Sequence, residues 1–393
     1  MLSKIKIFLR LLLKTKFKIL KENEKKYIIF DREGSSNISK LLPHDSYFIL
    51  DTRSENLKNV YLSKSIFLNI FKYFFINKKK IFTSYLISVI SEIKPSIIVT
   101  YIDNSFKFFE ISKLLEKQYK FIAIQLSARY DIIRFKLEFE KKIRHEDLTK
   151  YFFIPHYLCF GDYEKNLYKK NKILVKNYQK IGSLKLIQAM DYFKKSKEKI
   201  ENNKYDICLV SDDASGFSKH FSESSLEKDY AKIASFAIQF SKKFNKKFIF
   251  IWKRYQNHPD HIREYEFYRK QLTDNEFNYL LNNSVHKTDQ FSSYKALIES
   301  KVVIGVSTTM LREKLSLKGK ILTCNYTNLP LFNFPKDGIF VLKKYEYSDF
   351  ENKLNFLLEM SNEEYFDKIK EVAPYIIKFY DNNDLESVKK ILK

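Results

Sequence analysis

Cysteine, glycine and proline are scarce in this chain of 393 residues, with 3, 7 and 7 occurrences. So few glycines and prolines exclude a collagen-like, linker-rich or low-complexity chain. The cysteines, Cys159, Cys208 and Cys324, are odd in number and widely separated. They fit neither a disulfide framework nor a zinc motif, and therefore predict a reducing, cytoplasmic environment. The sequence also lacks the apolar run of about 18 residues that a membrane-spanning helix needs.

Several common functional motifs are missing as well. The sequence has no Walker loop and no Gly-x-Gly-x-x-Gly fingerprint, which argues against nucleotide hydrolysis and nicotinamide chemistry. It has no His-Glu-x-x-His or Asp-x-Asp spacing. We therefore expect no metal and no other cofactor.

Positive charge is abundant. Lys and Arg number 71 against 47 Asp and Glu, which gives a net charge of +24. Such an excess indicates an anionic partner, namely nucleic acid, a membrane surface or a phosphorylated substrate. Lys, Ile, Asn, Phe and Tyr are all common, as a strongly AT-rich genome would produce, so composition bias is a second explanation. The length suits two domains of about 150–200 residues each.

The first 21 residues combine charge with amphipathic spacing. They contain seven basic residues and no acidic one. At helical spacing, the apolar residues share one broad face and the lysines occupy the other. The sequence therefore predicts a basic amphipathic helix within residues 1–25 that lies on the anionic inner membrane from the cytoplasmic side. The alternative is a surface helix packed on its own domain.

Short apolar strands alternate with helices along the rest of the chain, which predicts parallel sheets with crossover helices. Strands are expected near 26–30, 47–51, 96–101, 120–125 and 157–160, and again near 206–210, 247–252, 302–305, 320–324 and 339–342. One helical stretch is expected over 61–92, and a polar helix over 184–204 is expected to connect the domains. The fold class is thus α/β, with two Rossmann-like doubly wound domains, 26–183 and 205–345, facing across a cleft. Helices in 346–393 are expected to pack across the junction.

Polar residues follow the expected strands of the second half. Ser307, Thr308 and Thr309 follow a strand and start a helix, which is an arrangement that seats anions, and Glu313 lies one turn further on. Lys253 and Arg254 follow another strand, with His258 just beyond them. These groups could neutralise a phosphate, with Glu313 on a ribose. His258 is also a candidate catalytic residue, which could donate a proton to a leaving oxygen. The alternatives are a plain helix cap, a surface charge and a solvated basic loop.

The first half offers acceptor-side residues. Asp103, at the end of the strand over 96–101, is the candidate general base for an acceptor hydroxyl. Its alternative role is a helix cap. The other candidates at strand ends are Asp31, Glu33, Gly34, Gln125 and Arg129.

Several of these segments resemble a GT-B glycosyltransferase, and in particular bacterial surface-carbohydrate biosynthesis proteins of the kind found in spirochaetes. The resemblance rests on FDREGSS (30–36), IIVTYIDNS (97–105), IAIQLSAR (122–129), KIGSLK (180–185), the segment 253–270 and VVIGVSTTMLREKL (302–315). It implies that a nucleotide donor lies on the second domain and the acceptor on the first.

A looser resemblance to bacterial GT-B sialyltransferases bears on the donor. Asp103, His258-Pro259 and Ser307-Thr308 occur in the order of that family's motifs, although Asp103-Asn104-Ser105 departs from its acidic motif. The resemblance implies a CMP-linked nonulosonic or ulosonic acid as donor, with a monophosphate leaving group that departs without a metal.

We therefore expect a metal-independent glycosyltransferase that transfers a sugar from a nucleotide donor to a surface polysaccharide or lipid-linked acceptor. One alternative is a polyol-phosphate transferase that uses a CDP-glycerol-like donor. Alternatives of other classes are a basic nucleic-acid-binding protein and an inactive GT-B scaffold. Basic residues are spread along the chain without a recognised nucleic-acid-binding module, so no nucleic-acid partner is expected.

Overall fold

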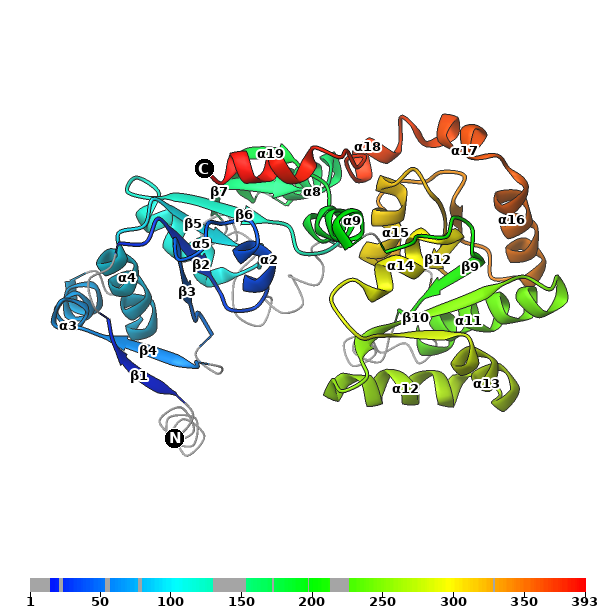
Figure 1. Cartoon of the computed structure of the whole chain (residues 1–393), viewed down its shortest axis with the longest axis horizontal. Helices are drawn as coiled ribbons and strands as arrows, with labels where there is room; N and C mark the ends of the chain where they lie inside the picture. The colour runs from blue at the N-terminus through cyan, green and yellow to red at the C-terminus, as the bar shows by residue number, and fades with distance from the viewer. Residues whose placement is uncertain are drawn as a thin grey trace.

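The protein consists of two α/β domains, each built on a six-stranded parallel sheet, joined by a helix and a C-terminal helical segment (Figure 1). A computed structural model describes residues 15–20, 24–53, 57–76, 80–129, 153–171, 173–196, 198–212, 226–327 and 329–393. The predicted fold class, two doubly wound parallel-sheet domains, is confirmed.

The sheet of the first domain has the strand order β3-β2-β5-β6-β7-β8. Its strands are β2 (Tyr27–Phe30), β3 (Tyr47–Leu50), β5 (Ile97–Thr100), β6 (Lys120–Ile124), β7 (Phe153–Cys159) and β8 (Leu174–Lys180). The helices of this domain are α2 (Ser35–Ser39), α3 (Lys64–Phe71), α4 (Ile81–Ile93), α5 (Phe106–Leu115) and α8 (Asp162–Lys170), with the π-helical turn η2 (Lys72–Ile76) after α3. Strands β2 and β5 are buried along their whole length, as expected for apolar strands that are covered on both faces.

Two expectations for this domain are wrong. The segment expected as one helix over 61–92 contains the end of β4 (Asn59–Leu62) and the separate helices α3 and α4. In the expected N-terminal helix, Lys16–Ile19 forms strand β1, which pairs in parallel with β4. Lysines and large apolar residues alternate along β1. This alternation has the period of two that is typical of a strand. Residues 1–14 and 21–23 lie outside the described residues.

The sheet of the second domain has the order β11-β10-β9-β12-β13-β14. Its strands are β9 (Tyr205–Val210), β10 (Phe248–Tyr255), β11 (Ser284–Lys287), β12 (Ser300–Gly305), β13 (Lys320–Cys324) and β14 (Val341–Leu342). The helices are α11 (Leu226–Lys243), α12 (Pro259–Gln271), α13 (Asp274–Asn282), α14 (Ser292–Ile298) and α15 (Thr309–Ser316), with a 3₁₀ turn η4 (Pro330–Phe332). The only tryptophan of the chain, Trp252, is fully buried in this domain's core.

The connecting helix α9 (Leu184–Ser196) buries more apolar side chains than expected of a polar linker. Leu184, Leu186, Ile187, Ala189 and Phe193 are all buried. The first half of the expected linker is therefore part of the packed structure. Leu184 and Ile187 pack into a core cluster of the first domain, whereas Leu186, Ala189 and Phe193 pack into the core of the second.

The last helices lead from the second domain to the first (Figure 1). They are α16 (Tyr347–Glu359), α17 (Asn362–Ile369), α18 (Ala373–Ile376) and α19 (Asp384–Ile391). The backbone N–H of Lys378 donates to the carbonyl of Phe160, and Lys120 Nζ donates to the carbonyl of Ile391 at 3.1 Å. This segment therefore ties the two domains together. None of the helices formed by the described residues has the length and apolar character needed to cross a bilayer.

Candidate functional site

The carboxyl ends of the parallel strands define the candidate site, because ligands of open α/β sheets bind beyond these ends. In the second domain, β10 and β12 flank β9. Lys253 and Arg254 at the end of β10 and Ser307 after β12 therefore lie on the same edge of one sheet. The fold thus places the basic side chains of Lys253 and Arg254 on the same sheet edge as the hydroxyl of Ser307, which is about 50 residues away in the sequence.

A buried glutamate fixes the backbone at the end of β10. The Glu264 carboxylate, on α12, accepts hydrogen bonds from the backbone N–H groups of Lys253 at 2.8 Å and Arg254 at 3.1 Å. It also accepts from the hydroxyl of Ser211, which follows β9. The carboxylate is fully buried and binds only the backbone of these two residues. The side chain of Lys253 is therefore left exposed and that of Arg254 half-buried. Sequence reasoning missed Glu264, since only the fold places it under this loop.

Arg254 has unused hydrogen-bonding capacity. Its Nη2 lies 3.7 Å from Asp260 Oδ2, which is a loose ion pair. Its Nε–H is buried and has no acceptor among the described residues. A guanidinium with an unsatisfied donor favours an additional anionic acceptor.

His258 is the N-cap of α12, and its environment sets its tautomer. Its Nδ1 accepts a hydrogen bond from the backbone N–H of Asp260 at 3.1 Å. Since Nδ1 accepts, the ring proton of the neutral imidazole lies on Nε2. With 43% of its side chain exposed, His258 can therefore donate from Nε2 to a ligand.

The loop after β12 leads into α15, as the sequence predicted. Asp212 Oδ2, at the end of β9, accepts from the backbone N–H of Val306 at 2.8 Å and so fixes the start of this loop. Thr308 is the N-cap of α15. The hydroxyl of Thr309 accepts from the backbone N–H of Ala128 in the first domain at 2.9 Å. Thr309 is the first residue of α15, so the amino end of this helix lies where the edge of the second domain's sheet meets the first domain.

Glu313 differs from its expected position on a ribose. Its side chain is 1% exposed and accepts hydrogen bonds from Ser183 at 2.5 Å and from the Tyr294 hydroxyl at 2.9 Å. Ser183 belongs to the first domain and Tyr294 to the second. The expected ribose contact is wrong for this arrangement, because the carboxylate is enclosed at the domain junction.

Asp103 also differs from the cleft-facing carboxylate that the sequence predicted. Its side chain is fully buried, and it forms an ion pair with Arg129. It also accepts from the Tyr157 hydroxyl at 2.8 Å and from the backbone N–H of Leu126 at 3.1 Å. Burial alone would lower the pKa of Arg129, but the Asp103 carboxylate raises it above its ordinary value. A general base must reach the proton that it takes, so this geometry favours a positioning role for Asp103.

The two other acceptor-side polar residues near Asp103 are also engaged within the protein. Arg129 is paired with Asp103 and keeps 13% of its side chain exposed. Gln125 is 1% exposed, donates to the carbonyl of Ser127 at 3.0 Å and accepts from the N–H of Phe160 at 2.7 Å. Both residues stabilise the loop after β6, and their expected contact with a substrate stays a prediction.

The turn after β2 presents one accessible carboxylate. Asp31 is buried and accepts from Thr52 and Arg53 at 3.0 Å each. Glu33, by contrast, keeps 57% of its side chain exposed and pairs with Arg53 at 2.5 Å. Gly34 adopts a φ of 76°, and a Cβ there would lie 2.7 Å from Tyr101, so only glycine fits.

A buried ion pair at the domain junction was missed by sequence reasoning. Arg312, on α15, lies 2.5 Å from Glu164, on α8 of the first domain, and their side chains are 3% and 0% exposed. Arg312 also donates to the carbonyl of Arg129 at 3.2 Å. These contacts hold the amino end of α15 against the first domain.

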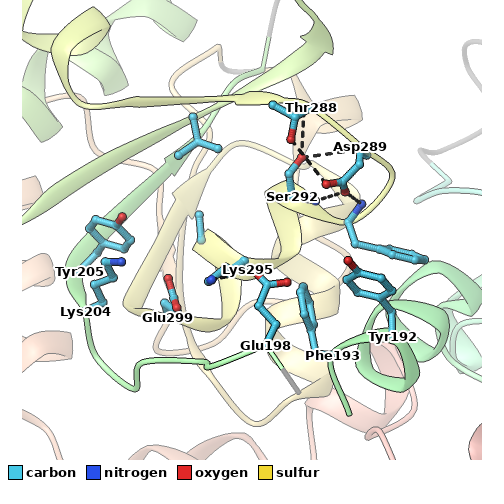
Figure 2. Close-up of a pocket in the computed structure, with 13 residues that line it drawn as sticks. Tyr192, Phe193, Glu198, Lys204, Tyr205, Thr288, Asp289, Ser292, Lys295 and Glu299 are labelled. Carbon is cyan, nitrogen blue, oxygen red and sulfur yellow. Dashed lines mark hydrogen bonds and ion pairs between the residues drawn. The ribbon is translucent and has the colours of Figure 1, made fainter. Parts of the chain in front are cut away.

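A pocket of about 350 Å³ lies beside α14, away from the candidate site (Figure 2). Tyr192 and Phe193 of α9 line one end, and Tyr205, at the start of β9, lies at the other. Its two lysines are already paired, Lys295 with Glu198 at 2.7 Å and Lys204 with Glu201 at 3.5 Å. The pocket therefore offers little net positive charge for a phosphate. Within the described ranges, no three or more His, Cys, Asp or Glu side chains are grouped as metal ligands.

Neither protein-family models nor curated proteins match this chain. Solved structures do match. UDP-GlcNAc 2-epimerase from Neisseria meningitidis, bound to UDP-GlcNAc, is similar with a TM-score of 0.54 at 15% identity, over 96% of this chain and 99% of that chain. Sucrose-phosphate synthase from Thermosynechococcus elongatus is similar with a TM-score of 0.51 at 8% identity, over 94% and 98%. The H444N variant of the wall teichoic acid polymerase TagF gives 0.50 at 10% identity, over 93% and 88%.

These matches extend over almost the whole chain, and they include both of its domains. At these identities a match reports the arrangement of the backbone rather than the reaction. The protein therefore has the two-domain GT-B fold.

Proposed function

We propose that this protein is a nucleotide-sugar-dependent glycosyltransferase that binds its donor on the second domain. The observation that carries the proposal is the cluster of exposed or half-exposed positive and proton-donating groups, Lys253, Arg254 and His258, at the carboxyl edge of a GT-B sheet. Several similar structures are of nucleotide-sugar enzymes, including an epimerase bound to UDP-GlcNAc.

The donor phosphate is the group that this cluster suits best. Arg254 provides a planar set of donors, and its buried Nε–H lacks an acceptor among the described residues. His258 donates from Nε2, and the amino end of α15 supplies backbone N–H groups and the positive end of a helix dipole. These groups would stabilise the negative charge that develops on a phosphate leaving group as the bond to the sugar breaks.

The candidate carboxylates for the base that activates an acceptor hydroxyl differ in burial. Among Asp31, Glu33 and Asp103, only Glu33 presents an exposed carboxylate. We assign the base to Glu33, held by Arg53. Asp103 and Arg129 take a positioning role in the loop after β6. Asp103 in turn orders the loop after β6, which contacts the second domain at Thr309.

The proposal extends to the chemical class of the donor and of the acceptor. A CMP-linked nonulosonic or ulosonic acid and a surface polysaccharide or lipid-linked acceptor are the classes that we propose. The second candidate function is polyol-phosphate transfer from a CDP-glycerol-like donor. It is favoured by the similarity to the wall teichoic acid polymerase TagF.

The test is a product assay. The purified full-length protein is incubated with CMP-, UDP-, GDP- and CDP-linked donors, with and without an oligosaccharide mixture, and products are followed by ³¹P and ¹H NMR. Glycosyl transfer predicts release of one nucleotide that increases with added acceptor. Appearance of an epimer with the nucleotide still attached would replace the proposal with an epimerase. Transfer of a polyol phosphate would support the second candidate.

A matched pair of variants connects the activity to the site. Arg254→Gln should abolish most donor turnover, whereas Lys270→Gln, an exposed change at the far end of α12, should leave it unchanged. Equal turnover in both variants would contradict the assignment of the donor site.

A further inference from the structure

Helix α3 and the turn η2 expose a continuous row of aromatic side chains. Phe67, Phe71 and Phe75 follow one another at helical spacing, with ring centroids 4.9 Å and 5.6 Å apart. Phe74 lies 4.8 Å from Phe75, and Leu68 lies on the same helix. We call Phe67, Leu68, Phe71, Phe74 and Phe75 the aromatic ridge.

The ridge is not part of the domain core. Phe67, Leu68 and Phe75 are 60%, 59% and 63% exposed. On the other side of the same segment, Ile66 is fully buried and Ile70 packs against the core of the first domain. Helix α3 therefore already buries one apolar face, and the ridge is a second apolar face. An amphipathic surface helix normally carries polar residues there, so the ridge marks a binding surface.

Further apolar residues extend this surface. Ile81, at the start of α4, is 64% exposed. Strand β4 ends directly before α3, and its partner β1 exposes Phe17 by 54% and Ile19 by 84%. Figure 1 shows β1, β4, α3 and α4 together at one end of the molecule, on the side of the first domain remote from the second.

The charge within the segment that contains the ridge has one sign. Residues 57–91 contain six lysines and no acidic residue. Lys64, Lys72 and Lys80 are exposed on the ridge segment, as are Lys16 and Lys18 on β1. A second copy of this chain would bring lysines against lysines, which is unfavourable. An anionic bilayer instead accepts both the aromatic side chains and the surrounding lysines.

We propose that the aromatic ridge and its lysines form a surface that docks on an anionic lipid bilayer. Phenylalanine side chains enter the interfacial region, and the lysines contact anionic headgroups. This docking would place the first domain next to the membrane and the second domain away from it. The inference does not depend on the transferase chemistry, and it concerns residues other than the segment 1–14.

The experiment is co-sedimentation of the full-length protein with phosphatidylcholine vesicles, with and without about one third phosphatidylglycerol. The ridge variant Phe67→Gln, Phe71→Gln, Phe75→Gln should bind anionic vesicles at least about tenfold more weakly, because three apolar side chains no longer enter the bilayer. The lysine variant Lys64→Gln, Lys72→Gln, Lys80→Gln should lose about fivefold for each lysine on anionic vesicles, and far less on neutral ones. The second variant keeps the proposal testable if the first does not fold.

Matched controls come from exposed residues elsewhere. Phe356→Gln with Ile262→Gln removes two exposed apolar side chains of the second domain, and Lys228→Gln, Lys270→Gln, Lys390→Gln removes three exposed charges. Both controls should bind as the wild type does. Wild-type vesicle binding by the ridge variant would overturn the proposal. The proposal would also be overturned if the wild type did not bind vesicles and was a dimer in analytical ultracentrifugation, whereas the ridge variant was a monomer.

Discussion

The ion pair between Arg312 and Glu164 gives a quantitative prediction about how the two domains are held together. It joins α15 of the second domain to α8 of the first, and both side chains are at most 3% exposed. Removing one partner leaves the other charge buried and unpaired, which typically costs about 3–5 kcal/mol. We expect Arg312→Met to lower the free energy of unfolding by about this amount.

The double variant is expected to behave differently. In the native pair, Glu164 Oε2 and Arg312 Nε have no hydrogen-bond partner among the described residues. The pair is thus incompletely satisfied, and each unsatisfied buried group costs about 1–3 kcal/mol. Replacing both residues by apolar ones, as in Glu164→Leu with Arg312→Met, should therefore restore stability to at least about the wild-type value.

Urea unfolding followed by far-UV circular dichroism and by the fluorescence of Trp252 measures these differences, and a double-mutant cycle gives the coupling energy. Two results would refute the reasoning. One is a loss of less than about 1 kcal/mol in Arg312→Met. The other is a double variant that is as unstable as the single one.

Three further predictions concern other buried and exposed groups. Burial lowers the pKa of Lys314 to about 8, whereas a lysine in the unfolded chain has a pKa of about 10.4, so the unfolded chain binds more protons between these two pH values. Stability should therefore rise between about pH 8 and pH 10 in the wild type, and this rise should vanish in Lys314→Met when unfolding is measured across that range. Asp103→Asn should destabilise the fold by about 3–5 kcal/mol, because Arg129 loses its buried partner, and near wild-type stability in urea would show that the pair is dispensable. Glu33→Gln should lower turnover by about 10²–10⁴ while nucleotide affinity changes less than about twofold, and full turnover would remove Glu33 as the base.

Much of the fold could be predicted from the sequence because the central strands are strongly apolar. Segments such as IIVT and FIFIW can only be buried, so β5 and β10 were expected where they lie. The edge strands are different. β8 is largely exposed and reads LVKNYQK, and β11 reads SVHK, so their pairing depends on the neighbouring strand rather than on hydrophobicity.

The positions of the candidate residues in the fold were predicted in part, and their contact with a donor stays a prediction. Strand-end positions located Lys253, Arg254, His258 and Ser307, because the carboxyl ends of parallel strands meet at one edge. The sequence could not show which carboxylates are buried. Glu313 is satisfied by Ser183, 130 residues away, and Asp103 by Tyr157, 54 residues away. Such partners are set by packing between distant segments.

The central claim is that a nucleotide donor binds at the carboxyl edge of the second domain's sheet. Isothermal titration of CMP, CDP, UDP and GDP into the wild type, Arg254→Gln and Lys295→Gln tests it directly, since Lys295 lines the separate pocket beside α14. We predict that one nucleotide binds the wild type and Lys295→Gln equally, and binds Arg254→Gln about 10- to 150-fold more weakly, as expected for loss of a charge-assisted hydrogen bond. Unchanged affinity in Arg254→Gln, or a loss confined to Lys295→Gln, would contradict the claim.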